Sequence, residues 1–135
     1  MAAPFLPVEP AALGRGHGFS HGLVAPADGR VLFVAGQTAP GAVGASAVEA
    51  FVAQFDGALD RVCRVVAEAG GTPECVGRMT VFVTSMQTYR ESRPRLSEAW
   101  HARMGRHFPA MSVVEVSALV DPDAVVEIEA TAVLP

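Results

Sequence analysis

The sequence contains no lysine and no asparagine, so arginine supplies all ten of its strongly basic side chains. Without lysine the chain cannot form a Schiff base, anchor pyridoxal phosphate or supply the lysine of a phosphate-binding loop. Without asparagine it has no acceptor for N-linked glycans. These two absences exclude several large enzyme classes before any motif is considered.

Cysteine and long apolar runs are also scarce. Cys63 and Cys75 are the only cysteines, and they form neither a CxxC motif nor a disulfide framework. The N-terminal residues lack a basic segment and are interrupted by prolines, so we expect no signal peptide. No apolar run approaches the ~20 residues that span a bilayer, so we expect no membrane partner. Together these features favour a cytoplasmic protein with reduced thiols.

The length and charge of the chain limit what it can be. With 135 residues, half of them hydrophobic, it is long enough for a single domain, residues 1–135, with its own core. The net charge of −4 disfavours avid binding to nucleic acid. The basic region between residues 90 and 107 is interpreted as a solvated helix face, with RNA or an anionic metabolite as the alternative. The four histidines show no zinc-binding spacing, so we expect no metal site.

Hydrophobic periodicity and turn residues predict the order β-β-α-β-α-β-β. Residues 1–13 carry three prolines and are predicted to form an extended N-terminal arm. A Pro26–Gly29 turn predicts a hairpin of two strands on either side of it. The expected elements after the arm are strands at 19–24 and 30–35, a helix at 47–69 with a Ser46/Glu49 capping box, a strand at 76–83, a helix from Pro94, and strands at 109–116 and 125–130.

The last two predicted strands, joined through Asp121–Asp123, alternate with the period of a half-buried sheet. We expect one face of this pair to lie against the core: Val114, Val116, Ala118, Val126, Ile128, Ala130 and Ala132. The other face would then carry Met111 and Val113 together with the carboxylates of Glu115, Glu127 and Glu129. Two helices can cover only one face of the sheet, so we expect the uncovered face to associate with further copies.

Carboxylates on such a face are candidates for general acid/base catalysis. The alternative is a solvated strand face or an interface salt bridge, and it is favoured for Glu115 and Glu129. From composition and motifs alone, the chain is an α+β domain that self-associates.

Five segments go further, because together they carry a family resemblance. Residues 29–37 resemble a hydrophobic strand ending in Ser-Gly-Gln, and residues 65–71 resemble a helix end rich in Glu, Ala and Gly. Residues 79–84 resemble a third strand, residues 108–116 a Pro-Ala-Arg-Ser signature, and residues 126–130 a closing Ile-Glu-Ile-Glu-Ala strand. On these segments the chain is identified as a member of the Rid family, also called YjgF-like proteins.

The resemblance implies a chorismate-mutase-like α+β fold, with one mixed sheet and two helices on one of its faces. It also implies a homotrimer whose sheets line a central barrel and whose ligands bind in clefts between subunits. In the founding members of the family the activity is cofactor-free hydrolysis of enamine/imine intermediates to 2-oxo acids and ammonia. The signature arginine forks onto the substrate carboxylate, and a glutamate of the last strand positions the attacking water.

This chain departs from that pattern at the signature position, where Met111 stands in place of arginine. A thioether cannot replace a bidentate, charge-assisted pair, and its loss is expected to cost several kcal/mol of binding. The family's cleft serine, tyrosine and asparagine fall on Ala35, Phe19 and Arg93, whereas the water-positioning glutamate is retained as Glu127. The expected site therefore has Glu127 as its catalytic group and a cleft lined by Met111, Phe19, Ala35, Gly36, Phe82, Arg93 and Val113.

Three functions follow from this reading. The first is a cofactor-independent enzyme with a remodelled cleft, which hydrolyses, deaminates or tautomerises a more apolar intermediate, with Glu127 as acid/base and Arg93 as a relocated anion anchor. The second is a non-catalytic trimer that binds a metabolite or a protein. The third is ribonuclease activity or translation inhibition, which the acidic net charge disfavours.

Overall fold

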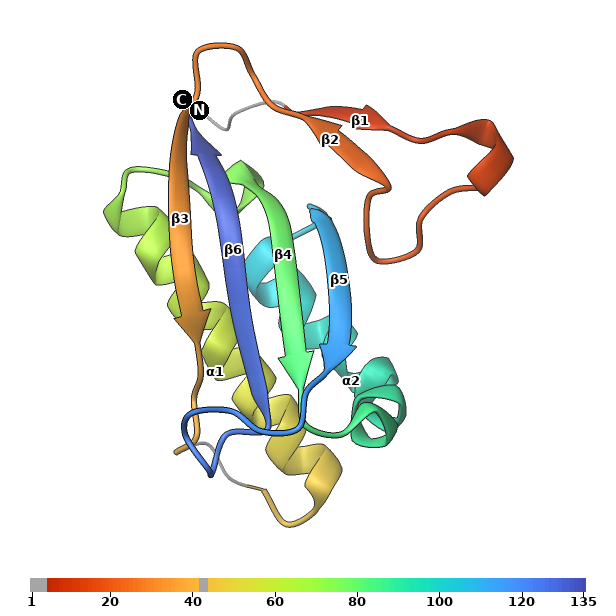
Figure 1. Cartoon of the computed structure of the whole chain (residues 1–135), viewed down its shortest axis with the longest axis vertical. Coiled ribbons are helices and arrows are strands. Elements are labelled where there is room, and N and C mark those ends of the chain that lie inside the picture. Colours follow the sequence, from red (N-terminus) through yellow and green to blue (C-terminus); the bar gives the residue numbers. More distant parts are fainter. Residues whose placement is uncertain (1–4, 42–43) are drawn as a thin grey trace.

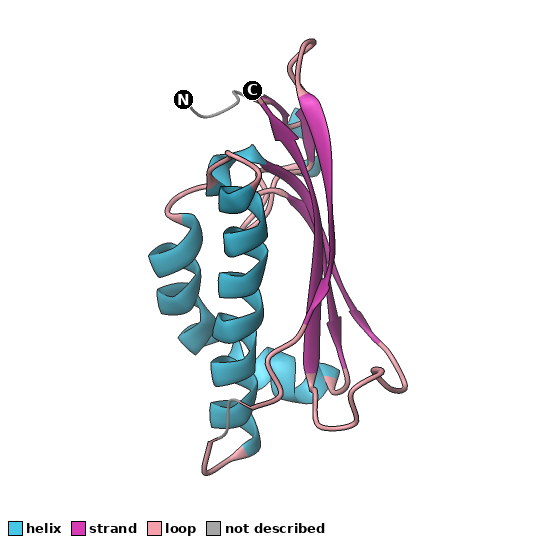
Figure 2. Ribbon diagram, turned by 90° about the vertical axis from the view of Figure 1, so that its left-hand side faces the viewer, coloured by secondary structure: helices cyan, strands magenta, loops and turns pink. Residues whose placement is uncertain are grey.

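The computed structural model describes residues 5–41 and 44–135. Its centre is a four-stranded sheet of order β3-β6-β4-β5, with two helices packed on one face (Figures 1 and 2). This is the α+β arrangement that the sequence predicts. The elements are β1 (Leu6–Val8), a 3₁₀ turn η1 (Ala11–Leu13), β2 (Gly22–Val24), β3 (Arg30–Gln37), α1 (Ala47–Glu68), a 3₁₀ turn η2 (Pro73–Cys75), β4 (Val76–Val83), α2 (Met86–Met104), β5 (Ala110–Glu115) and β6 (Val126–Leu134).

The sheet is mixed, because β4 and β5 run parallel while β6 runs antiparallel to both of its neighbours. The central strands β4 and β6 alternate, and their inward side chains are buried against the helices. Figure 2 shows that the opposite face has no helix over it, and we call it the open face. It exposes large apolar side chains, with Phe33 at 80%, Val31 at 57% and Val114 at 39% of their full surface.

Helix α1 forms as predicted, and its ends have the expected capping. The Ser46 hydroxyl accepts the Glu49 amide at 3.2 Å, while the Glu49 carboxylate accepts the Ala45 amide at 2.8 Å. At the other end Gly70 adopts a φ of 89°, a left-handed conformation that glycine accepts without strain. The helix buries the predicted stripe against the sheet: Phe51, Phe55, Ala58, Leu59, Val62 and Val66.

Helix α2 begins eight residues earlier than predicted, at Met86, and contains Pro94 in its interior. An interior proline costs about 3 kcal/mol, which is why the sequence favoured a start at Pro94. Two contacts stabilise the early start: the Ser85 hydroxyl accepts the Thr88 amide at 3.2 Å, and the Glu115 carboxylate accepts the Met86 amide at 2.8 Å. The buried stripe includes Leu96, Trp100 and Met104 as predicted, and Ser92 one turn earlier.

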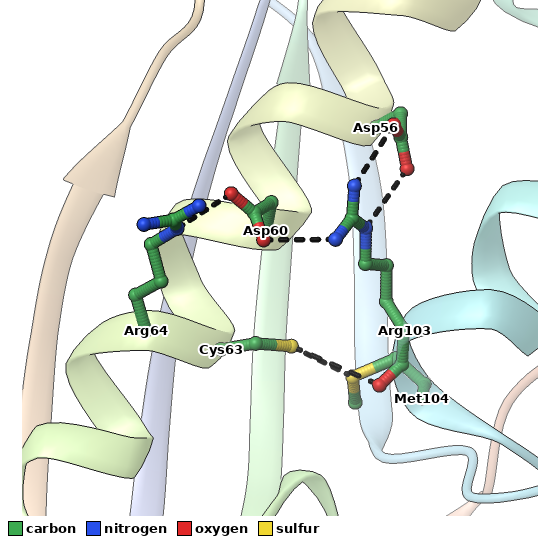
Figure 3. A network of polar contacts seen from close by, with 6 residues as sticks. All are labelled: Asp56, Asp60, Cys63, Arg64, Arg103 and Met104. Carbon is green, nitrogen blue, oxygen red and sulfur yellow. Dashed lines mark hydrogen bonds and ion pairs between the residues drawn. The ribbon is translucent and has the colours of Figure 1, made fainter.

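The two helices are joined on their outer side by a charged network (Figure 3). Arg103 of α2 donates to both carboxylate oxygens of Asp56 at 3.1 and 3.2 Å, and to Asp60 at 2.9 Å. These bonds raise the pKa of Arg103, with Asp56 as the largest cause. Beneath the network, burial raises the pKa of the Cys63 thiol, whose sulfur lies 3.8 Å from Sδ of Met104. The bonds of Arg103 and the packing of Cys63 against Met104 join α2 to α1.

The prediction of which face of β5 is buried was wrong. In the observed register Met79 pairs with Met111 and Val81 with Val113, so Met111 and Val113 point toward the helices. Val114 is instead exposed on the open face. Glu115, on the helix side, caps α2, and only Glu127 and Glu129 remain as carboxylates of the open face. The assignment for β6 is confirmed: Val126, Ile128, Ala130 and Ala132 are all buried.

The N-terminal part also differs from the prediction. Strand β2 pairs with β1, with Leu6 opposite Val24, and does not pair with β3. The turn itself is present, since the Gly29 amide donates to Pro26 O at 3.3 Å, but its flanking strands diverge. The expected extended arm contains β1 and η1, and its residues 1–4 lie outside the described part of the chain. The predicted single sheet is therefore two sheets, and β1 and β2 project beyond the main one (Figure 1).

No helix among the described residues is both long and apolar enough to cross a bilayer.

Candidate functional site

Glu127 lies on the open face, in strand β6 between β3 and β4 (Figure 1). Its partner across the β4 pairing is Phe82, whose neighbours Val81 and Val83 point into the core. On its other side is Gly36. A Cβ at Gly36 would come within 2.7 Å of Cδ of Glu127, so the carboxylate occupies the space that a side chain would need. The glycine of the predicted cleft therefore makes room for the predicted catalytic group.

A break in the β3–β6 register creates this arrangement. The pairing is regular from Arg30 to Val34 and resumes at Gln37, which leaves Ala35 and Gly36 in an irregularity between them. The Gln37 side chain fixes the break, since its amide donates to Ala35 O at 3.0 Å and its oxygen accepts from Arg61 at 3.1 Å. Ala35 itself is exposed at this point. The Glu127 carboxylate therefore lies directly beside this irregular part of β3.

The Glu127 carboxylate is half-buried and has no cationic partner among residues 5–41 and 44–135. An unpaired carboxylate keeps its lone pairs available for a water molecule or a substrate proton. Glu129, two residues on, is exposed on the same face and lines a separate hollow of about 280 Å³ together with Arg78. Of the two, Glu127 has the more enclosed surroundings.

Met111 and Val113 lie on the opposite side of the sheet and line a cavity between α2, β5 and the loop before β2. We call it the α2 cavity; its volume is about 280 Å³. Arg93 also lines it, from the exposed side of α2. The remaining lining is mostly aromatic or imidazole: His17, Gly18, Phe55, Val81, Tyr89, Leu96, Ser97, Trp100, His101 and Phe108.

The loop reaches this cavity because Ser20 is held against the short segment that leads into β5. The Ser20 hydroxyl donates to Phe108 O at 2.6 Å, and its amide donates to Pro109 O at 3.1 Å. Phe19, predicted as a lining residue, packs edge-on against His21 at 5.2 Å and does not line the cavity. Its neighbours His17 and Gly18 take that place.

The predicted site residues are therefore divided between two faces of one sheet. Ala35, Gly36, Phe82 and Glu127 belong to the open face, while Met111, Val113 and Arg93 belong to the α2 cavity. Within a single chain the sheet separates the two groups, so one small ligand cannot touch both. We call these two groups of predicted residues half-sites.

Sequence reasoning missed the aromatic and imidazole part of the α2 cavity. Tyr89, Arg93, Leu96 and Trp100 come from successive turns of one helix, and their spacings of four, three and four residues place these side chains on one side of it. That signal was present in the sequence, but the helix was expected to begin at Pro94, after Tyr89 and Arg93.

A larger cavity of about 840 Å³ lies between the β1–β2 pair and the body of the protein, with charges of both signs along its wall. Within the described ranges, no three His, Cys, Asp or Glu side chains come together as a metal-binding set.

Comparison with known proteins is consistent with this geometry. Residues 9–134 match the family described as Endoribonuclease L-PSP. A solved structure of YyfB from Yersinia pestis, a Rid-family protein of unknown function, is 28% identical with a TM-score of 0.71, over 99% of this chain and 100% of that chain. A YjgF/YER057c/UK114-family protein from Mycobacterium tuberculosis is 32% identical with a TM-score of 0.62, over 87% of each chain. No curated protein matches the chain.

The YjgF protein of E. coli is also similar, at 31% identity and a TM-score of 0.64, over 92% of this chain and 91% of that chain. The similarity to these neighbours, together with the two helices on one face of the mixed sheet of this chain, confirms the predicted chorismate-mutase-like fold. The family match spans almost all of the described residues, including both half-sites. The chain therefore belongs to the Endoribonuclease L-PSP family, which is the YjgF/Rid family that its sequence resembles.

Proposed function

We propose that this protein is a cofactor-independent cytoplasmic enzyme that hydrolyses an enamine or imine intermediate with Glu127 as its acid/base group. The observation that carries the proposal is the half-buried Glu127 carboxylate, which sits against Gly36 with no cation beside it among the described residues. A carboxylate in such a setting can accept a proton from water and return it to a leaving nitrogen.

The reaction needs no electron acceptor. Glu127 removes a proton from water as the hydroxide oxygen bonds to the imine carbon, and the carbon–nitrogen π electrons move to nitrogen. Glu127 returns that proton to nitrogen, which gives the neutral carbinolamine. The carboxylate then accepts the hydroxyl proton as the carbonyl forms and passes it to the nitrogen, which leaves as ammonia when the carbon–nitrogen bond breaks. The overall change is imine plus water to carbonyl plus ammonia.

The site is completed by a second copy of the chain in a homotrimer. The open face exposes Phe33, Val31 and Val114, an apolar area that is costly to leave in water. Burying this face against the β5 edge of a neighbour would bring the Glu127 half-site of one copy next to the α2 cavity of another. That arrangement supports a ligand that touches both groups, which a single chain does not allow.

The substrate is expected to differ from the small 2-imino acids of the founding family members. Met111 offers no donor for a carboxylate, whereas Arg93 reaches the same cavity from α2. We assign Arg93 as the anion anchor, with Met111 and Val113 as apolar walls. Ribonuclease activity is a weaker alternative, because Glu127 and Glu129 add negative charge to the open face of an already acidic chain.

The test is hydrolysis of imines generated in place from large apolar amino acids by an amino-acid oxidase, followed by 2-oxo-acid release. Glu127→Gln keeps the shape of the side chain but cannot exchange a proton, and we expect a loss of about a hundredfold or more in kcat. Glu129→Gln, two residues away on the same face, is the matched control and should stay within about twofold of wild type. Equal rates for Glu127→Gln and wild type would contradict the proposed reaction and favour the non-catalytic binding function.

A further inference from the structure

The α2 cavity has the walls of a binding site for a flat ring. Trp100 and Phe108 stack on each other with centroids 5.9 Å apart and an angle of 1° between their planes. The Trp100 indole is fixed because its Nε1 donates to His107 O at 3.1 Å. With Tyr89 and Phe55 these side chains give the cavity four aromatic residues. Aromatic walls stabilise a bound ring by more than the area it buries.

The cavity volume agrees with a single ring and a short side arm. An apolar cavity of about 150 Å³ is large enough to hold benzene. The α2 cavity, at about 280 Å³, leaves room for a ring with a few additional atoms and is small for a bicyclic ligand with a long chain.

Arg93 places a positive charge at the rim of the cavity, and no carboxylate of the described residues lines it. His17 and His101 also line the rim. Arg93 forms no ion pair within the described part of the chain, so its five donors are free for a ligand. The His101 ring is held by the hydrogen bond that its Nδ1 donates to Ser97 O at 2.8 Å. The Arg93 guanidinium is therefore the group of this site that selects an anion.

On these grounds, and resting on the proposed function, we propose that the enamine or imine substrate carries an aromatic ring and a carboxylate. Its ring lies in the α2 cavity against Trp100 and Met111, and its carboxylate pairs with Arg93. Met111 then has a positive role, since a flexible thioether makes favourable contacts with a ring where a guanidinium would fill the space and bring charge. The replacement at this position and the position of Arg93 are two parts of one change of specificity.

Trp100 provides a direct readout, because it is the only tryptophan of the chain. Phenylacetate, a stable probe that cannot be hydrolysed, is titrated while the Trp100 emission is followed. We expect a saturable change in emission. Phenylacetate should bind about tenfold or more tighter than neutral phenylacetamide, because phenylacetamide cannot form the charge-assisted pair with Arg93. Cyclohexylacetate, which keeps the charge but not the aromatic ring, should bind about threefold or more weaker than phenylacetate.

Arg93→Gln should bind phenylacetate about tenfold or more weaker and abolish its preference over phenylacetamide. Arg95→Gln removes an exposed arginine of the same helix that does not line the cavity, so it should match wild type. Melting curves of both variants establish that any loss is not unfolding. Equal affinities for phenylacetate and cyclohexylacetate, or unchanged phenylacetate binding in Arg93→Gln, would overturn the proposal.

The same titration separates this inference from the proposed function. Glu127→Gln is expected to keep the Trp100 response to phenylacetate while losing imine hydrolysis. If phenylacetate leaves Trp100 unaffected while imine hydrolysis depends on Glu127, the aromatic assignment is wrong and the proposed reaction stands. If the titration succeeds and hydrolysis is absent, the proposed reaction is wrong and the cavity is a binding site for aromatic acids.

Discussion

Gly36 and Glu127 share one space: the carboxylate of Glu127 fills the position where a side chain at residue 36 would begin. Gly36 does not have a positive φ, so its backbone does not require glycine. The lack of a side chain at this position is therefore explained by the Glu127 carboxylate and not by the backbone conformation of Gly36. A substitution at Gly36 should for this reason affect the site more than it affects folding.

Gly36→Ala is expected to fold normally and to lose activity. The new methyl group meets the end of a flexible side chain, which can rotate away at little cost, but the carboxylate then leaves its position. We expect a fall of about tenfold or more in kcat/KM, equivalent to ~1.4 kcal/mol of transition-state stabilisation. Steady-state kinetics measure the loss. The melting temperature serves as the control, and a fall in stability as large as the fall in activity would contradict this account.

Met111→Arg is expected to exchange one specificity for another. The side chain points into the α2 cavity beside Arg93, so a second guanidinium would fill the apolar space and offer a fork to a small carboxylate. Phenylacetate should bind about tenfold weaker and pyruvate about tenfold tighter than in wild type. Calorimetric titration of both ligands measures these two changes in affinity. Met111→Leu, which keeps the apolar volume, should retain phenylacetate binding.

Phe33→Gln is expected to weaken self-association. Phe33 is 80% exposed on edge strand β3 of the open face, and removing its ring takes away about 2 kcal/mol of apolar burial for each interface that covers it. Light scattering after size-exclusion chromatography should show trimer for wild type and smaller species for the variant on dilution. Leu13→Gln alters another exposed apolar residue, 64% exposed and away from this face, and should remain trimeric.

Arg103→Gln is expected to destabilise the contact between α1 and α2 by ~1 kcal/mol, because a network with a bidentate arginine contributes more than an isolated surface pair. Urea unfolding measures the difference, and 1 M salt should reduce it, since about 3 Å of screening length remains at that concentration. Arg64→Gln removes a 78% exposed partner of Asp60 and should change stability by no more than about 0.5 kcal/mol. Equal effects of the two substitutions would show that the bridge between helices contributes little.

The elements that the sequence predicts best are those with strong local signals. Helix α1 has a capping box, a regular apolar stripe and a terminal glycine, and its limits agree with the prediction to one residue. Strand β4 agrees at both ends, because its alternation is unambiguous. The turn at Pro26–Gly29 also forms. In each case the physical cause lies within a few residues of the feature.

The predictions from sequence are wrong where contacts between residues far apart in the chain determine the structure. Both faces of β5 are apolar in part, since Val114 alternates with Met111 and Val113, and only the pairing with β4 determines which one is buried. The start of α2 depends on Glu115, 29 residues away from the amide that it caps. The pairing of β1 with β2 likewise had no local signal, because Pro7 in β1 makes the arm look irregular.

For the candidate site, the sequence identifies most of the residues but not their division between two faces. The resemblance assigns all eight to one cleft, whereas the structure places four at the open face, three at the α2 cavity and Phe19 beside it. The aromatic walls of the cavity were identified only from the fold.

The separation of the two half-sites has a genetic consequence. In a closed ring of identical chains, every active site would combine Glu127 from one chain with Arg93 from the next. On the proposed function, chains that carry Glu127→Gln would lose hydrolysis on their own, and chains that carry Arg93→Gln would bind the substrate weakly. Mixed rings of the two would nevertheless contain a site built from the intact half of each. Two defective alleles expressed together would therefore restore part of the activity that neither provides alone.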